Sequence, residues 1–233
     1  MNIPTTRLGL RPRPFIWVLL LGCILAYPLA PAVSSPSGDK RDYILVINTY
    51  AESTPWSRGI ITDITARVEQ IENLELYTEH INLLLVDSPR EIETFETNLL
   101  REYGKKPPRA LVLIGTPTAL LRNFINSIWK GIPTIVCAEQ DFVGPDKYYQ
   151  KRLPIPASEQ VPLRTLADRD NLTLLYSPAY LDQSIDLMKR ILPGMDRLIF
   201  IDDARYVNRQ TEHDLAELLD SKYGGIKYTV YSA

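Results

Sequence analysis

Residues 43–60 read YILVINTYAESTPWSRGI, and this stretch decides the fold. Its first five residues form an unbroken apolar run, which predicts a parallel strand that is buried on both faces. Thr54 and Pro55 then place a hydroxyl at an N-cap and proline at the first helical position, which predicts a helix start. The turn at 48–53 would follow the carboxyl end of the strand, where open α/β sheets bind ligands.

Length, charge and cysteine content limit the class of protein. The 233 residues are enough for two small lobes or one large domain. The formal net charge is −2, and the chain after residue 40 has no basic block, which argues against a nucleic-acid partner. Cys23 lies in the N-terminal apolar run and Cys137 in a predicted buried strand, so we expect no internal disulfide and interpret Cys137 as a core residue.

Residues 1–40 are interpreted as a signal peptide or membrane anchor followed by a linker. A basic segment with three arginines precedes an apolar run at 15–29, and Ala30-Pro31-Ala32 offers a cleavage site. The apolar run also approaches the ~20 residues of a spanning helix, so an uncleaved anchor is left open. In both cases the positive flank predicts that the rest of the protein is periplasmic or otherwise extracytoplasmic.

Strands and helices alternate through residues 41–141, which we expect to form an N-terminal α/β lobe. Each predicted strand is an apolar run, and each is followed by a segment with helical spacing of apolar residues. This alternation predicts a doubly wound α/β fold with right-handed crossovers. The predicted strands after the first are 74–78, 110–114 and 133–138.

A second lobe is predicted after a segment without a regular pattern. Residues 142–170 contain several prolines and no sustained period, so we interpret them as the crossover or hinge between lobes. Strands are then predicted at 172–176, 198–201 and 226–231, within a second lobe at 171–233. Because the sequence ends at the third of these strands, its sheet would have an open edge. We therefore expect two parallel-sheet lobes, the second incomplete, in a fragment of a longer protein.

A repeated pair of residues marks candidate binding positions. A hydroxyl residue followed by proline occurs at Thr54, Ser88, Thr116 and Ser177. Free backbone N–H groups at such helix starts suit carboxylate, phosphate or carbonyl groups. The alternative is that these pairs are only helix caps, and we expect Ser88 to be structural.

Side chains close to these predicted helix starts supply further candidate contacts. Tyr50 and Trp56 could stack on a flat or sugar-like ligand, although packing of Trp56 in the core is an equal alternative. Glu139 and Gln140 follow a predicted strand and could bind polar or cationic groups. The predicted ligand-binding residues are Tyr50, Ser53, Thr54, Trp56, Thr116, Glu139 and Gln140.

Catalytic and metal-binding motifs are absent from the sequence. It has no G-x-S-x-G elbow, Walker loop, G-x-G-x-x-G or H-E-x-x-H. His80 and His213 are interpreted as surface polar residues, and the adjacent Asp202 and Asp203 supply too few ligands to argue a metal site. We therefore expect a binding protein that has no cofactor and no enzymatic activity of its own.

Five segments carry a resemblance through their order and spacing. They are YILVINTYAESTPWSRGI at 43–60, LYTEHI at 76–81, PRALVLIGTPTALL at 108–121, GIPTIVCAEQ at 131–140 and PAYLDQSIDLMKRILPGMDRLIFIDD at 178–203. Together they resemble the periplasmic sensor region of bacterial sensor histidine kinases, including hybrid kinases. That region is similar to the substrate-binding proteins of certain ABC transporters.

The resemblance covers roughly 41–233 and implies a type I periplasmic binding-protein fold. It implies a small-molecule solute between two lobes, with Ser53, Thr54, Trp56, Thr116 and Glu139 near the cleft. The implied parent is a membrane-bound histidine kinase, dimeric through the receptor and held in the membrane by the N-terminal segment or by a part beyond this sequence. A substrate-binding protein of an ABC transporter is the alternative, and the ligand's identity stays open.

Overall fold

The computed structural model describes residues 41–82, 88–167, 171–203 and 205–232, and residues from Arg41 onward form one compact unit. The predictions for residues 1–40, including the export signal and Cys23, lie outside the described residues. Within the described residues, no helix combines the length and the apolar character that crossing a membrane requires.

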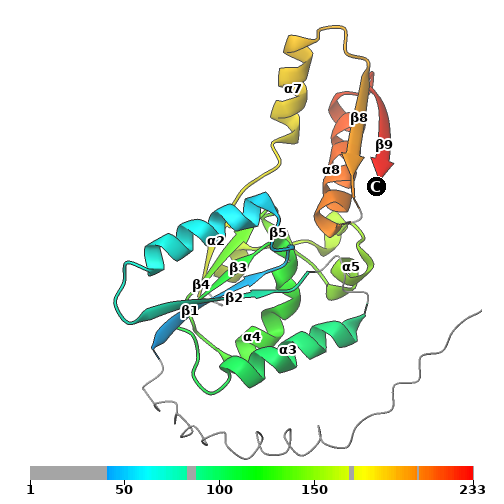
Figure 1. Ribbon diagram of the computed structural model, residues 1–233. Helices are drawn as coiled ribbons and strands as arrows, with labels where there is room; N and C mark the ends of the chain where they lie inside the picture. Colours follow the sequence, from blue (N-terminus) through cyan, green and yellow to red (C-terminus); the bar gives the residue numbers. More distant parts are fainter. Residues whose placement is uncertain (1–40, 83–87, 168–170, 204, 233) are drawn as a thin grey trace, which may run out of the picture. The chain divides into compact units, whose positions relative to one another are not determined.

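A five-stranded sheet, in which every neighbouring pair is parallel, organises the structure (Figure 1). The strand order β2-β1-β3-β4-β7 extends first to one side of β1 and then to the other, which is the doubly wound arrangement. The predicted α/β class with parallel sheets is therefore confirmed. The strands are β1 (Asp42–Asn48), β2 (Leu74–His80), β3 (Ala110–Ile114), β4 (Thr134–Ala138) and β7 (Leu172–Tyr176).

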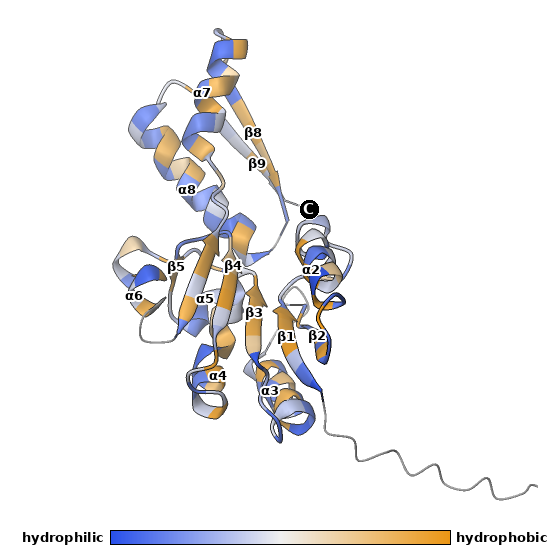
Figure 2. Ribbon diagram, turned by 90° about the vertical axis from the view of Figure 1, so that its left-hand side faces the viewer, coloured by the Kyte–Doolittle hydropathy of each residue, from blue (hydrophilic) through white to orange (hydrophobic). Residues whose placement is uncertain are grey.

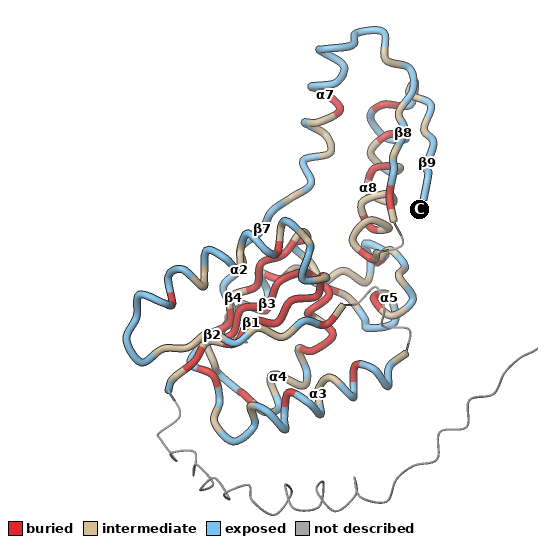
Figure 3. Tube along the Cα trace, viewed as in Figure 1, coloured by how far each residue is buried: buried red, intermediate tan, exposed pale blue. Residues whose placement is uncertain are grey.

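Helices cover both faces of this sheet because its central strands are apolar on both sides (Figure 2). Side chains alternate along a strand, so Val46 of β1 packs on one face, under α2 (Pro55–Val68), and Leu45 and Ile47 pack on the other. The three side chains are fully buried, as Figure 3 shows for the centre of the sheet, and each contributes about 1.5–3 kcal/mol.

The opposite face is covered by three consecutive helical elements and their flanking loops. α3 (Pro89–Tyr103) begins with a capping box at Ser88 and ends at Gly104, as the sequence predicts. The helix predicted after Thr116 is instead a 3₁₀-helix, η1 (Thr116–Leu121), which continues into α4 (Arg122–Ile128).

Residues 142–167, which belong to the predicted crossover between lobes, pack into the core of the first sheet. Their side chains at Val143, Tyr149, Ile155 and Leu163 are buried in the same cluster as Leu45. The sequence pattern misses these elements because two-residue strands and single helical turns have no readable period. They are β5 (Phe142–Val143), α5 (Asp146–Lys151), η2 (Ala157–Glu159), β6 (Val161–Pro162) and α6 (Arg164–Ala167).

Strand β7 corrects the predicted start of the second lobe. The sequence analysis places residues 172–176 in that lobe, but they pair with β4, from Thr134 opposite Leu172 to Ala138 opposite Tyr176. The ladder continues past the strand, because the Ser177 amide donates to the Ala138 carbonyl at 2.9 Å. The helix predicted at Ser177-Pro178 therefore begins only after this extended segment.

The remaining elements form a second α/β layer. They are α7 (Leu181–Ile191), β8 (Arg197–Asp202), α8 (Tyr206–Lys222) and β9 (Lys227–Ser232). β8 and β9 are parallel, and their inner face packs against α7 and α8 around Ile185, Leu215 and Leu219. The start of α8 packs on the first core, where the rings of Tyr206 and Tyr149 lie 4.6 Å apart between centroids.

Candidate functional site

The candidate site lies where the strands of the five-stranded sheet end. In the order β2-β1-β3-β4-β7, the chain reverses direction of winding between β1 and β3, and ligands of such sheets bind outside the carboxyl ends of the strands at this point. A cavity of about 600 Å³ is lined by residues that follow β1, β4 and β7, together with residues of α7 and α8. Both layers of the structure therefore contribute to one cavity.

Local hydrogen bonds fix the loop after β1, which carries Tyr50. The side chain of the buried Asn48 accepts from the Tyr50 amide at 3.1 Å and donates to Ser57 at the start of α2 at 3.3 Å. Thr49 donates its amide and its hydroxyl to the Ile114 carbonyl of β3, both at 3.0 Å. The predicted binding loop is thus held rigidly on the sheet.

Tyr50 and Trp56 form one aromatic wall of the cavity. Their ring centroids are 5.8 Å apart and their planes are nearly perpendicular, at 86°. Trp56 is half-buried, packs against the apolar cluster between the sheet and α2, and also lines the cavity. The two interpretations of Trp56, core packing and cavity lining, therefore both hold.

Glu139 joins three parts of the site through its carboxylate. Oε1 accepts a hydrogen bond from the Tyr50 hydroxyl, and Oε2 accepts from the amide and the hydroxyl of Thr116 at 3.0 and 3.1 Å. Burial raises the pKa of Glu139, and the Thr116 amide and the positive charge of Arg205 oppose this rise. The carboxylate thus fixes the Tyr50 ring against the start of η1.

The Thr116 helix start, which the sequence predicts to offer free donors, already binds this protein carboxylate. Thr116 is 1% exposed, and its hydroxyl also accepts from the Gln140 amide at 3.2 Å. It does not line the large cavity. The physical reason is that β3 and β4 are neighbours, so Glu139 at the end of β4 reaches the amide that follows β3.

Of the other six predicted ligand-binding residues, five line the cavity and one does not. Tyr50, Thr54, Trp56, Glu139 and Gln140 line it, so these five are brought together. Gln140 is only 6% exposed, and its Oε1 has no hydrogen-bond partner in the described part of the chain. Ser53, in contrast, is exposed and is not among the lining residues.

The predicted ligand-binding residues omit much of the cavity lining, including Tyr176, Tyr180, Arg205 and Asp214. Tyr176 ends a strand and Arg205 follows one, so a search of all strand ends would have found both. Tyr180 and Asp214 carry no such signal, because their position depends on how α7 and α8 pack.

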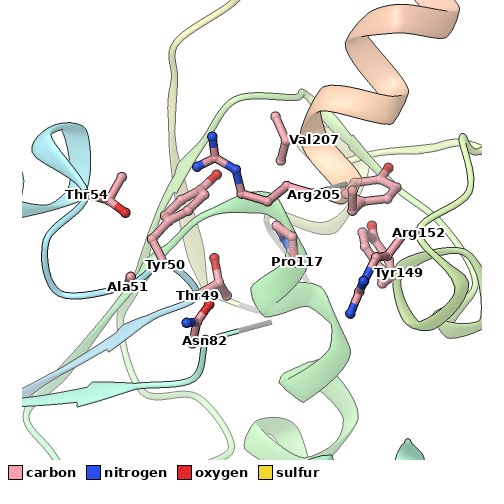
Figure 4. Close-up of a pocket in the computed structure, with 11 residues that line it drawn as sticks. Thr49, Tyr50, Ala51, Thr54, Asn82, Pro117, Tyr149, Arg152, Arg205 and Val207 are labelled. Atoms are coloured by element: carbon pink, nitrogen blue, oxygen red, sulfur yellow. The ribbon is translucent and has the colours of Figure 1, made fainter. Parts of the chain in front are cut away.

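A second, smaller cavity of about 50 Å³ adjoins the first, and both are lined by Tyr50, Thr54 and Arg205. In Figure 4 the Arg205 side chain extends toward Tyr50 and Thr54. Its guanidinium contacts the Asp203 carboxylate at 2.8 Å, which lowers the pKa of Asp203 against the effect of burial. Arg205 thus brings the end of β8 to the wall of the cavity.

The arrangement is suited to binding. It combines aromatic faces, a few fixed polar groups and a volume within the ~300–1,000 Å³ range of small-molecule sites. Among the described residues, no group of three or more His, Cys, Asp or Glu side chains is placed to hold a metal ion.

Comparison with known proteins gives structural neighbours only. No protein-family model matches the chain, and no curated protein matches it. A conserved domain protein from Vibrio cholerae has a TM-score of 0.51 and 17% identity, over 83% of this chain and 58% of that one. An ABC domain from Streptococcus pneumonia in complex with L-Trp has a TM-score of 0.47 and 12% identity, over 83% of this chain and 57% of that one.

A third solved structure, an extracellular ligand-binding receptor from Rhodopseudomonas palustris, gives a TM-score of 0.45 and 12% identity, over 83% of this chain and 46% of that one. The chain thus spans less than two thirds of the length of these structures. At 17% identity, the likeness to the Vibrio cholerae structure shows a shared fold.

Proposed function

We propose that this chain is a solute-binding region of the periplasmic-binding-protein type, and that the cavity of about 600 Å³ at the strand ends is its ligand site. The observation that carries the proposal is that one cavity is lined from both layers, by the loop after β1 and by α7 and α8. A ligand in such a cavity contacts both layers at once and stabilises their association.

The rigidity of the cavity wall supports a binding role. Tyr50, Glu139 and Thr116 are joined by hydrogen bonds before any ligand arrives. Because little ordering of these groups is then needed on binding, more of the contact energy is available as affinity.

The finer proposal is that the chain is the extracytoplasmic sensor region of a membrane-bound histidine kinase. The resemblance of residues 43–60, 108–121 and 178–203 to such sensor regions supports it, as does the export signal predicted in residues 1–40. In this proposal the kinase lies in a further part of the same polypeptide, which dimerises in the membrane. Delivery of a solute to an ABC transporter is the alternative.

A binding screen with two matched variants tests the solute-binding proposal. Tyr180 and Tyr231 are each 60% exposed, but only Tyr180 lines the cavity. We expect at least one solute class to raise the melting temperature of the full chain by linkage, and Tyr180→Ala to weaken that ligand severalfold. Tyr231→Ala, the control, should leave its affinity unchanged. No shift with any solute class would refute the proposal.

The choice between sensor and transporter protein needs a different readout. Once a ligand is known, autophosphorylation of the complete receptor in membrane vesicles should change when the ligand is added on the extracytoplasmic side. A ligand that binds the chain but alters only solute uptake, with no kinase activity in the complete polypeptide, would favour the transporter alternative.

A further inference from the structure

Two of the ionised groups that line the large cavity are already paired with opposite charges. Arg205 contacts the Asp203 carboxylate at 2.8 Å, and Asp182 accepts from the Lys222 ammonium at 2.6 Å. Asp182 also lies in the first turn of α7, where its charge offsets the positive end of the helix dipole. Arg205 and Asp182 thus each have an oppositely charged partner, although Lys222 also lies 3.6 Å from the Asp186 carboxylate.

The other two lining carboxylates, Glu139 and Asp214, form no ion pair within the described residues. Their recorded hydrogen bonds come from neutral groups; Gln210, for example, donates to Asp214 Oδ1 at 2.8 Å. Both carboxylates act on Tyr206, whose pKa is raised by burial and, in part, by their two charges. Both carboxylates line one cavity, although Glu139 follows β4 and Asp214 lies on α8.

An independent observation also points to a ligand with hydrogen-bond donors. Gln140, in the wall of the same cavity, is 6% exposed, and its Oε1 has no partner among the described residues. A buried acceptor without a donor is destabilising by about 1–3 kcal/mol unless a bound group supplies the donor. The acceptor lies next in sequence to Glu139, which is one of the two unpaired carboxylates.

Aromatic rings supply the rest of the cavity wall. Three of them, on Tyr50, Trp56 and Tyr176, come from loops and strand ends of the five-stranded sheet, and Phe142 and Tyr180 also line the cavity. Asp214 lines the same cavity as Tyr176 and Tyr180, so a carboxylate and aromatic rings face one space. A ring face beside a carboxylate is a favourable environment for an organic cation.

We infer that the cavity takes a small organic cation, a protonated amine on a flat ring, with the ring among the aromatic side chains and the ammonium near Asp214 and Gln140 Oε1. This inference rests on the proposed solute-binding function and names its ligand class. The ammonium neutralises a carboxylate that has no counter-ion, and its N–H groups supply the donor that Gln140 lacks.

Three compounds with one ring and different charges test the inference. Tryptamine, 3-ethylindole and indole-3-propionate carry a cationic, a neutral and an anionic group on the same indole. Isothermal titration of the full chain at pH 7 should give tryptamine an affinity about tenfold above that of 3-ethylindole, with the propionate weakest. The order of the three affinities tests the inference on the wild-type chain alone.

Two substitutions in α8 test whether the ammonium of the ligand binds at Asp214. Asp214→Asn should weaken tryptamine about tenfold and leave 3-ethylindole unchanged, because only the ammonium uses the carboxylate. Asp220→Asn is the matched control, since it makes the same substitution on the same helix at an exposed residue that does not line the cavity. Melting curves of both variants establish that they are folded.

The outcomes separate the inference from the proposed function. Equal affinities for the three indoles, or equal losses in Asp214→Asn and Asp220→Asn, would overturn the cation inference and leave solute binding intact. Binding of none of the three, with a hit elsewhere in the solute screen, would also overturn only the inference. If neither the three indoles nor any solute of the screen binds, both the cation inference and the solute-binding proposal are refuted.

Discussion

Replacement of Gly115 by alanine tests the packing beneath the binding loop. Gly115 links β3 to η1 with φ of +98° and ψ of 136°, a conformation that residues with a side chain adopt at a cost of about 1–3 kcal/mol. A Cβ atom at this position would lie 2.0 Å from Thr49 Oγ1 and 3.0 Å from a ring carbon of Tyr50. Overpacking of this kind adds about 1–3 kcal/mol.

We therefore expect Gly115→Ala to lower the free energy of unfolding by about 2–6 kcal/mol, the sum of these two effects. Gly131→Ala is the control, because Gly131 also has a positive φ, of +81°, but a Cβ there would meet nothing within 4 Å. The control should show only the backbone strain, about 1–3 kcal/mol. Urea unfolding measures the free energy of unfolding of both variants, and the comparison is valid where their m-values are equal.

A double mutant separates the contact from the strain. Thr49→Ala alone loses the hydrogen bond from its hydroxyl to the Ile114 carbonyl, at a cost of about 1 kcal/mol. In the Gly115→Ala background it also removes the 2.0 Å contact, so the double mutant should be more stable than additivity predicts. Strict additivity, or equal losses for Gly115→Ala and Gly131→Ala, would refute this account of the loop.

Three further predictions concern other parts of the site. Trp56→Ala should weaken ligand binding and also destabilise the fold by about 2 kcal/mol, less than the 3–5 kcal/mol of a fully buried tryptophan, because Trp56 is half-buried; denaturant unfolding with ligand titration separates the two effects. Glu139→Gln should change the pH dependence of stability. The pKa of Glu139 is raised above its ordinary 4.5, so in the pH range above 4.5 the folded protein binds this proton more tightly than the unfolded chain, and wild type loses stability as the pH rises through the raised pKa. The variant should lack this loss, and parallel curves from pH 4.5 to pH 8 would contradict the assignment. Gln210→Ala removes the acceptor 2.7 Å from the Ile155 amide, so hydrogen exchange at this amide should accelerate by about 5- to 150-fold relative to the Leu45 amide, which corresponds to a loss of about 1–3 kcal/mol.

Long regular elements of the fold were predictable from sequence. The apolar runs at 43–47 and 110–114 identify β1 and β3 because a parallel strand covered on both faces needs apolar side chains on both sides. The helix start at Pro55 and the capping box at Ser88 have local causes, so a local reading finds them. These features need no knowledge of which strands are neighbours.

The features that sequence reasoning missed depend on contacts between distant residues. β7 belongs to the first sheet because it pairs with β4, where Thr134 lies opposite Leu172 although the two residues are 38 positions apart in the sequence. Nothing within residues 172–176 indicates which strand they pair with. The donors of Thr116 are bound by Glu139 for the same reason, since the two residues meet only because β3 and β4 are adjacent. The presence of Asp214 and Tyr176 in one cavity likewise depends on tertiary packing.

The ladder between β4 and β7 has a consequence for communication within the molecule. The Ser177 amide is bonded to the Ala138 carbonyl, one residue before Glu139, and four residues later the chain enters α7. Only residues 178–180 lie between this hydrogen bond and α7, so a short segment joins the start of α7 to the backbone beside Glu139. If a ligand in the proposed site favours one orientation of α7, that orientation favours the ligand to the same extent, because coupling between binding and conformation is reciprocal.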